Sequence, residues 1–484
     1  MVNLMQVDPG LLRRVVDRGR ELGAQYVEAR FQDDYVVGIG TRNDRVIAVY
    51  NNRSSGVGIR VLVNGALGFA STNSTSLSDL LETVEYAISQ AKATSSLRKK
   101  PIEFSEEEVS KGKYGVEEKE RLLDFGVEEM IKLAMEIYSA SKSSVKEAKL
   151  PFLSTDIRVH IQEKLVVTSE GAQIEARVPR LYVNAFSVLM HLEKGTLQRS
   201  RWLAGSGGAE LIKKWDPVKV FSEEQARLEK VLVSGVAPPS ESIWVVLGPE
   251  VVGLIAHESA GHPMEADRIL GREASQAGES YVKPEFIGKY KIGNKYATVI
   301  DDPTIPNSYG FFLYDDEGVK ARPRYLYNEG VIYEPLHNRH TAKIFNTKSN
   351  GAARSMDYTS EPIIRMSNTY LAPGNISFEE LIEDIDLGIY VKSYMEWNID
   401  DVRWNQRYVG LEAYMVRKGE LAEPVRNPVL EFTTGWFYSN ILGVDKNLEF
   451  YPGTCGKGEP SQGVPVWFGG PNVKLSKMRV GVLA

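Results

Sequence analysis

Cysteine is almost missing from the 484-residue sequence, which contains one, Cys455. One cysteine cannot form an internal disulfide, so nothing indicates an oxidising compartment. Long apolar runs are also missing, because no window approaches the roughly 18 apolar residues that a membrane helix needs. We therefore expect a protein that does not enter a membrane. The N-terminal segment shows no signal-peptide pattern, which favours a cytoplasmic protein.

An excess of basic residues is missing as well. Lys and Arg total 58 against 64 Asp and Glu, which gives a formal net charge of −6. Because there is also no basic platform with interleaved aromatic residues, we expect no nucleic-acid partner. Hydrophobic residues make up 43% and charged residues 25% of the chain. These values are typical of globular proteins and exclude a disordered chain.

The chain is too long for one core, since hydrophobic cores stop growing near roughly 250–300 residues. Helical spacing predicts helices over residues 9–22, 76–94, 117–146 and 209–230. Strand patterns occupy residues 24–70 and 155–203. The charge-rich segment 95–120 is expected to be a solvated loop. The sequence Val-Ala-Pro-Pro at 236–239 is the best domain boundary. We therefore predict an α+β protein with a mixed α/β N-terminal domain (1–235) and a β-rich C-terminal domain (236–484).

One notable helix is predicted in the second half. A strand pattern at 242–247 is followed by Gly-Pro-Glu at 248–250, which is typical of a helix start. Residues 251–255 are apolar on nearly every side, so we expect this helix to be buried. It leads directly into His-Glu-Ser-Ala-Gly-His at 257–262. This H-E-x-x-x-H pattern is one residue longer than the familiar zinc-protease signature.

The spacing of the two histidines requires an irregular helix. Side chains four residues apart lie about 40° from each other around an ideal helix, whereas side chains five apart lie about 140° from each other. A single-turn π-bulge would bring His257 and His262 to one side, and such bulges cluster at functional sites. Gly261 and Pro263 suit a distorted or ending helix. The alternative is structural: two hydrogen-bonded histidines beside a salt-bridged Glu258.

Two histidines leave a catalytic zinc short of one protein ligand, because such sites usually have three together with a water. The candidates for the third ligand are Glu265, Asp267, His337, His340 and Cys455. Cys455 lies in the glycine-rich segment 452–458, which predicts an accessible thiolate rather than a core residue. The pattern therefore favours Cys455.

Together these residues resemble the TldD/PmbA family of metalloproteases, on its catalytic TldD side. The resemblance covers nearly the whole chain and rests on several separated segments: residues 56–61, 65–70, 257–267, 301–303, 315–319, 365–370, 373–374, 455–457 and 464–466. Several motifs in the right order are far more specific than one H-E-x-x-x-H.

The resemblance implies a zinc peptidase that acts on unstructured peptides, with one zinc ion in each catalytic chain. It assigns the metal to His257, His262 and Cys455, and the role of general base to Glu258. It also implies a dimer, either with a PmbA/TldE-like subunit that lacks the zinc motif or with a second copy of this chain, and an active site enclosed between subunits.

For the mechanism, we expect Glu258 to take a proton from the attacking water and to return it to the leaving amine. The candidates for an additional oxyanion donor are Tyr309, His337, Arg339, His340 and Arg365. We expect the substrate to bind in extended form along an exposed sheet edge. Two other functions fit the same residues: a non-catalytic peptide-binding subunit, and a metal-dependent hydrolase of a non-peptide bond.

Overall fold

The computed structural model describes residues 7–274 and 277–483 and confirms the α+β class. Its N-terminal half is built on one sheet of long strands, in the order β3-β2-β1-β5-β6-β4, with β7 pairing the remaining part of β6. The elements of this half are α1 (Pro9–Glu21), β1 (Tyr26–Arg42), β2 (Arg45–Val63), β3 (Ala66–Thr72), α2 (Leu77–Ser95), β4 (Lys111–Gly115), α3 (Val127–Ser144), β5 (Lys149–Thr168), β6 (Gln173–His191), β7 (Gly195–Ser206), α4 (Glu210–Trp215) and α5 (Pro217–Ser234).

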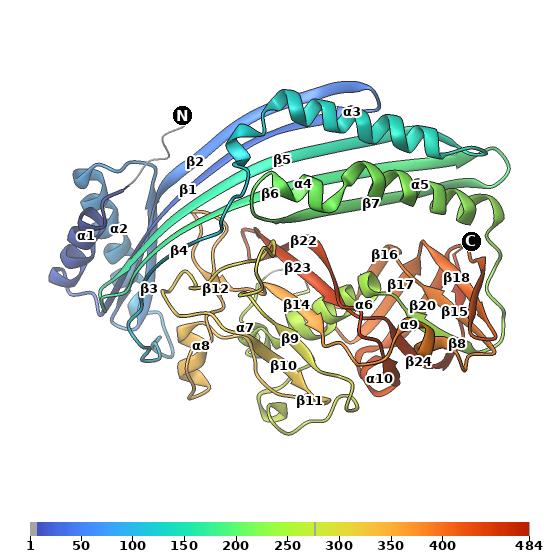
Figure 1. Ribbon diagram of the computed structural model, residues 1–484. Helices are drawn as coiled ribbons and strands as arrows, with labels where there is room; N and C mark the ends of the chain where they lie inside the picture. Colours follow the sequence, from blue (N-terminus) through green and yellow to red (C-terminus); the bar gives the residue numbers. More distant parts are fainter. Residues whose placement is uncertain (1–6, 275–276, 484) are drawn as a thin grey trace.

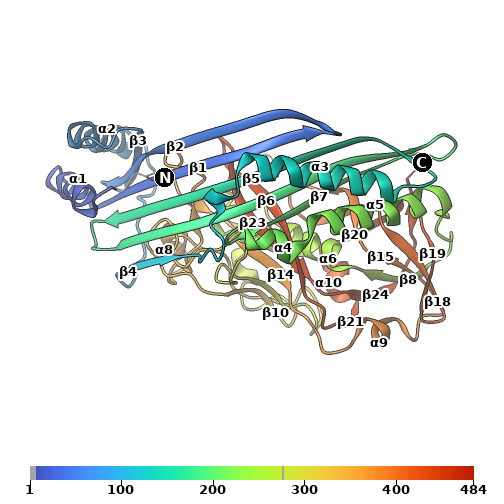
Figure 2. The same ribbon diagram turned by 45° about the horizontal axis from the view of Figure 1, so that its top comes forward.

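Local sequence signals account for several of these elements. Asp8 accepts a hydrogen bond from the backbone of Gly10 and caps α1, with Pro9 in the first turn. Asn64 and Gly65 both adopt positive φ angles of 49° and 71°, as the tight turn between β2 and β3 requires. Helices α3, α4 and α5 lie on one face of the curved sheet, and the C-terminal half lies under the other face (Figure 1). Figure 2 shows α1 and α2 together at one end of the long strands.

Two expectations for this half are wrong in detail. The segment 95–120 is not entirely a solvated loop, because β4 pairs in parallel with β6 and Ile102 is buried. The predicted helix at 117–146 begins later, at Val127, after a short 3₁₀ turn at Leu122–Asp124. Both differences arise from contacts with a distant strand, which the spacing of neighbouring residues in the sequence does not indicate.

The C-terminal half is β-rich and contains three main sheets. Their strand orders are β11-β10-β9-β14-β23-β22, β19-β18-β15-β8-β24-β21 and β16-β17-β20-β25. The strands are β8 (Ile243–Leu247), β9 (Val299–Asp301), β10 (Arg324–Asn328), β11 (Val331–Ile332), β12 (Ala353–Arg354), β13 (Ile363–Ile364), β14 (Asn368–Leu371), β15 (Leu387–Val391), β16 (Tyr394–Ile399), β17 (Asn405–Gly410), β18 (Ala413–Arg417), β19 (Glu420–Pro424), β20 (Pro428–Thr433), β21 (Ile441–Val444), β22 (Glu449–Lys457), β23 (Gln462–Gly470), β24 (Val473–Met478) and β25 (Gly481–Val482).

The predicted buried helix is α6 (Pro249–Ala256), and all eight of its residues are buried. It is accompanied by four shorter helices that the sequence did not reveal: α7 (Ala266–Ile269), α8 (Arg339–Ile344), α9 (Phe378–Ile382) and α10 (Thr434–Ser439). Gly253 brings α6 into backbone contact with β23, since a Cβ at this position would lie 2.6 Å from the nitrogen of Gly469. This close approach places the end of α6 beside the β22–β23 hairpin.

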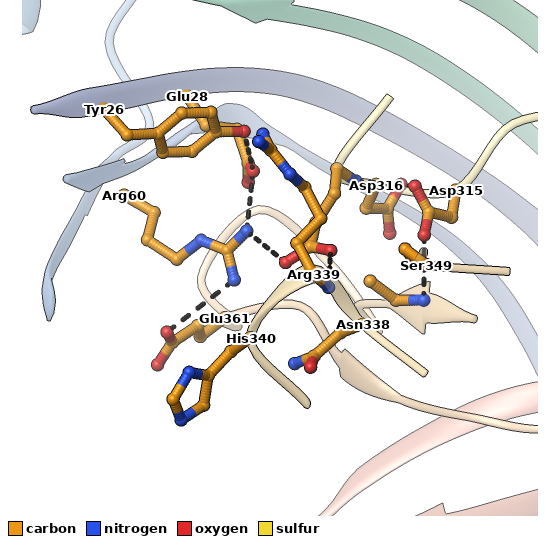
Figure 3. Close-up of polar contacts among 12 residues, drawn as sticks. Tyr26, Glu28, Arg60, Asp315, Asp316, Asn338, Arg339, His340, Ser349 and Glu361 are labelled. Atoms are coloured by element: carbon orange, nitrogen blue, oxygen red, sulfur yellow. Dashed lines mark hydrogen bonds and ion pairs between the residues drawn. The ribbon is translucent and has the colours of Figure 1, made fainter. Parts of the chain in front are cut away.

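A buried ionic network joins the two halves (Figure 3). The guanidinium of Arg60 on β2 donates to Glu28 on β1 and to Glu317 in the C-terminal half, both at 2.8 Å. Glu317 also accepts the backbone N–H of Arg339 at 2.8 Å. Because buried charges are stable only when they are paired, this network fixes the N-terminal sheet over the C-terminal half.

The division into domains at 1–235 and 236–484 stays a prediction. Among the described residues, no helix has both the length and the apolar character that crossing a lipid bilayer requires.

Candidate metal centre

The two motif histidines lie where the helix changes its winding. α6 ends at Ala256, a π-helical turn covers His257–Gly261, and a 3₁₀ turn follows at His262–Met264. The wider turn brings the two imidazole rings to a centroid distance of 5.0 Å. The irregularity that the five-residue spacing predicts is therefore confirmed.

Cys455 reaches the same point from β22. Its Sγ lies 3.5 Å from Nε2 of His262, and one potential ligand atom from each of His257, His262 and Cys455 lies within 4.8 Å of the others. The expectation of an accessible thiol is wrong, since Cys455 is only 5% exposed. The glycines around it belong to the paired strand β22, where Cys455 lies opposite Val464, and not to a surface loop.

The three side chains have the chemistry of a metal site. Burial would raise the pKa of the Cys455 thiol, but the charges of His262 and Arg365 and the hydrogen bonds from the histidines lower it well below its ordinary value. A thiolate with two imidazoles is a donor set that zinc accepts in tetrahedral geometry. The buried Nδ1 of His257 has no hydrogen-bond partner, as is expected of a polar atom at a site that a further group completes. These residues therefore fit a zinc ion.

Glu265, a candidate third ligand, lies behind His262 instead of beside the thiol. Its Oε2 is 3.0 Å from Nδ1 of His262 and accepts a hydrogen bond of 2.6 Å from Arg268. Burial alone would raise the pKa of Glu265, but the positive charges of Lys457 and Arg268 lower it well below its ordinary value. An ionised carboxylate on Nδ1 leaves Nε2 of His262 to face Cys455, which is the usual arrangement behind a metal-bound histidine.

The remaining candidate ligands contact residues outside the metal centre. Asp267 accepts hydrogen bonds of 2.8 and 2.7 Å from Lys457. Nδ1 of His337 lies 3.1 Å from the hydroxyl of Thr341. His340 contacts Arg272 and the carbonyl of Glu103. None of these three belongs to the cluster of potential metal ligands found among the described residues.

The predicted oxyanion donors are also placed elsewhere. Tyr309 belongs to an aromatic cluster with Tyr182 and Trp467, and Arg339 binds Glu170 and the carbonyl of Ser105. Arg365 donates to the backbone carbonyl of Cys455, so it supports the strand and does not face the cavity. Of the five candidates, all within the described part of the chain, none lines the pocket at the metal centre.

Glu258 has a partner that the sequence did not indicate. Its carboxylate contacts the guanidinium of Arg403, and both side chains are largely buried. Arg403 has a φ of 68°, a region that non-glycine residues rarely adopt. The carboxylate of Asp400 stabilises this turn by accepting from the backbone of Trp404 at 2.7 Å and of Asn405 at 3.1 Å. Nothing in the sequence around Arg403 indicates a contact with Glu258.

A cavity of about 280 Å³ adjoins the metal centre. Its walls come from α6, the π-helical turn and β23, and from three strands that each lie at the edge of a sheet, β7, β16 and β22. The residues that line it are Gln198, Arg199, Ser200, Arg201, Trp202, Glu250, Leu254, His257, Glu258, Tyr394, Met395, Trp397, Tyr451, Pro452, Gly453, Thr454, Cys455, Val466 and Phe468. A mostly apolar cavity that contains a few polar groups and a thiol of lowered pKa is typical of a ligand-binding site.

Known proteins are similar to this chain over nearly its whole length. Sequence profiles of the PmbA/TldA metallopeptidase domain 1, central domain and C-terminal domain match residues 27–93, 120–228 and 240–482. A protein named metalloprotease from Methanothermobacter thermautotrophicus is 31% identical, over 94% of this chain and 95% of its own length. A zinc metalloprotease TldD homolog from Saccharolobus solfataricus is 26% identical, over 97% and 99% of the two chains. The crystal structure of TldE from Thermococcus kodakarensis has the same fold, with a TM-score of 0.73 and 17% identity over 97% of this chain and 100% of that one.

Proposed function

The chain belongs to the PmbA/TldD family of metallopeptidases, and we propose that it is a zinc-dependent peptidase that hydrolyses unfolded peptides. One observation carries the proposal: potential ligand atoms of His257, His262 and Cys455 lie within 4.8 Å of one another, and Glu258 lines the same cavity as His257 and Cys455. His257, His262 and Cys455 would hold the ion through three protein ligands, the number that catalytic zinc sites usually have.

Each residue then has a defined task. When bound, zinc would polarise the scissile carbonyl as a Lewis acid and lower the pKa of the attacking water. Glu258 accepts the proton of the attacking water and returns it to the leaving nitrogen. Glu265 holds the ring of His262 in the orientation that presents Nε2. Arg403 compensates the charge of Glu258 in a largely buried position.

Unfolded peptides suit the surroundings of the cavity. The edge strands β7, β16 and β22 each have backbone groups on one side that no strand of their own sheet pairs. An extended peptide can add to such an edge through main-chain hydrogen bonds, which depend little on side-chain identity. The partner in solution is a second copy of this chain or a TldE-like subunit. We place the protein in the cytoplasm.

The test of catalysis is the variant Glu258→Gln. It keeps the shape of the side chain but removes the base, so cleavage of denatured casein falls by several orders of magnitude while zinc content stays unchanged. Glu396→Gln serves as the matched control, because Glu396 is exposed on β16 and does not line the cavity. Full activity of Glu258→Gln would contradict the mechanism. Ester or phosphoester hydrolysis without peptide cleavage would identify a different hydrolase.

The test of the third ligand is the metal content of Cys455→Ser. Wild-type protein binds about one zinc ion per chain, and the serine variant retains only a small fraction of it after dialysis, because a hydroxyl is a much poorer ligand than a thiolate. Unchanged zinc content would show that Cys455 is not a ligand. Full zinc content without chelator-sensitive cleavage in any variant would indicate a structural zinc in a peptide-binding subunit.

A further inference from the structure

Two arginines of the edge strand β7 line the cavity, and they differ in how they are paired. Arg199 donates to both oxygens of Glu250 at 2.9 Å and to Glu224 at 3.1 Å, so its guanidinium is fully engaged. Arg201 has one distant contact, 3.4 Å from Nη1 to Oε2 of Glu250. The buried Nε of Arg201 has no hydrogen-bond partner.

The guanidinium of Arg201 is nevertheless held in place. It lies over the ring of Tyr451, with 4.8 Å between its central carbon and the ring centroid. Stacking covers one face of the planar group and leaves its N–H edge available. A fixed guanidinium with free donors is pre-organised for a planar acceptor, and carboxylates bind such a fork through two parallel hydrogen bonds.

The other charged residues that line the cavity already have partners. Glu250 is engaged by Arg199, and Glu258 is engaged by Arg403. The two negative charges of Glu224 and Glu250 equal the two positive charges of Arg199 and Arg201, so the four residues together have no net charge. Arg201 therefore offers a ligand free N–H donors but no excess positive charge. Of the two arginines that line the cavity, both of which the structure describes, Arg201 is therefore the one with hydrogen-bond donors left for a ligand.

We propose that Arg201 binds a carboxylate of the peptide substrate close to the scissile bond. The inference rests on the proposed peptidase function and specifies its substrate class. Because Arg201, His257 and Cys455 line one cavity of about 280 Å³, the carboxylate lies within about one to three residues of the bond, at roughly 3.4 Å per extended residue. It is the C-terminal carboxylate or an acidic side chain, and a neighbouring apolar side chain packs against Trp202, Tyr394 and Trp397.

Two matched peptide pairs separate the sources of the carboxylate. The first pair shares one sequence and ends in a free acid or an amide two residues after the cleaved bond. The second pair is amidated and carries Glu or Gln at that position. A charge-assisted pair of hydrogen bonds predicts a kcat/KM preference of roughly 10- to 100-fold for the acidic member of one pair. A preference in the first pair indicates a terminal carboxylate, and a preference in the second indicates an acidic residue.

The variant Arg201→Met retains much of the stacking volume on Tyr451 but has no donors. We expect this variant to reduce the kcat/KM preference for the acidic peptide to less than about threefold, mainly through a change in KM. We expect Arg201→Lys to retain part of the preference, because an ammonium group keeps the positive charge but lacks the two parallel donors of a guanidinium. Arg407→Met, on β17 outside the lining of this cavity, is the control and keeps the wild-type preference. Thermal unfolding and zinc content show that each variant is folded and loaded.

Binding of the same peptides to Glu258→Gln, measured by calorimetry, separates this inference from the peptidase function. One outcome is that the wild-type protein cleaves no peptide, while Glu258→Gln binds the acidic peptide of a pair more tightly than its neutral counterpart and Arg201→Met abolishes this difference. In that case the proposed peptidase function is wrong and the carboxylate site is correct. If both members are cleaved and bound equally, and Arg201→Met changes neither, the carboxylate site is wrong and the peptidase function stands. Absence of both cleavage and binding overturns both.

Discussion

The guanidinium of Arg403 lies against the carboxylate of Glu258, although 145 residues separate the two in the sequence. The contact joins the turn between β16 and β17 to the π-helical turn that carries the metal motif. Glu258 therefore has a counter-charge and lines the same cavity as His257 and Cys455. The backbone of Arg403 is held in a left-handed conformation to make this contact.

Replacing Arg403 tests both the ion pair and the backbone. Arg403→Ala leaves Glu258 without its partner, and removing one member of a buried pair typically lowers the free energy of unfolding by about 3–5 kcal/mol. Arg403→Gly loses the same pair but suits the φ of 68°, so it should be more stable than the alanine variant by about 1 kcal/mol. Urea unfolding of the zinc-loaded proteins measures both differences. An alanine variant as stable as the glycine variant would show that the turn is not strained.

The carboxylate behind His262 should determine zinc affinity. Glu265→Gln preserves the side-chain shape but removes the negatively charged carboxylate that lies beside Nδ1 of His262. Changes of this kind weaken metal binding by about 10- to 100-fold. Asp267→Asn is the matched control, because Asp267 binds Lys457 instead of the histidine. Competitive titration with a chromophoric zinc chelator gives both affinities. A larger loss in Asp267→Asn than in Glu265→Gln would contradict this assignment.

The π-helical turn depends on the absence of a side chain at position 261. A Cβ on Gly261 would lie 1.9 Å from the sulfur of the buried Met366. Gly261→Ala should therefore lower the free energy of unfolding by about 1–3 kcal/mol, as overpacking of a core does, and should also reduce zinc content.

A double-mutant cycle identifies the source of that loss. Met366→Ala removes the clashing sulfur, so Gly261→Ala in this background should be less destabilising by at least about 1 kcal/mol. Chemical unfolding of the four proteins provides the cycle. Additive effects would mean that the turn needs glycine for its backbone and not for the contact with Met366.

His337 should make stability depend on pH in the acidic range. Burial lowers the pKa of this imidazole from 6.5 to about 4, because the charged form loses its hydration. The unfolded chain then binds a proton that the folded chain does not, so this contribution to stability is complete above pH 6.5 and is lost as the pH falls toward 4. The total is about 3 kcal/mol at 1.36 kcal/mol per pH unit. Unfolding of wild type and His337→Gln across this range should show a steeper loss in the wild type; parallel curves would exclude the effect.

The features that the sequence predicted correctly depend on neighbouring residues. Asp8 and Pro9 specify the start of α1 through a side-chain cap and a fixed φ. The turn at Asn64 and Gly65 follows from their tolerance of positive φ. The irregular winding at His257 follows from arithmetic on a five-residue spacing, since a regular helix would separate the two rings.

The features that the sequence did not predict depend on distant partners. β4 forms because β6 offers an edge, and Cys455 is buried because β23 pairs with β22. Glu265 looked like a ligand from its position near His262, but Arg268 and Lys457 bind its carboxylate and fix it behind the ring. Arg403 reaches Glu258 from the turn between β16 and β17, Arg201 lines the cavity from β7, and no local pattern indicates either position.

The position of Cys455 also has a consequence during synthesis of the chain. His262 leaves the ribosome 193 residues before Cys455, and β8, which leads into α6, gains its two neighbours only with β15 and β24. At about 5–20 residues per second, this interval lasts about 10–40 s. Throughout it, the nascent chain has His257, His262 and Glu258 but lacks Cys455. The proposed peptidase activity therefore has to wait until residue 455 has been made, and the growing chain is protected from premature cleavage during this interval.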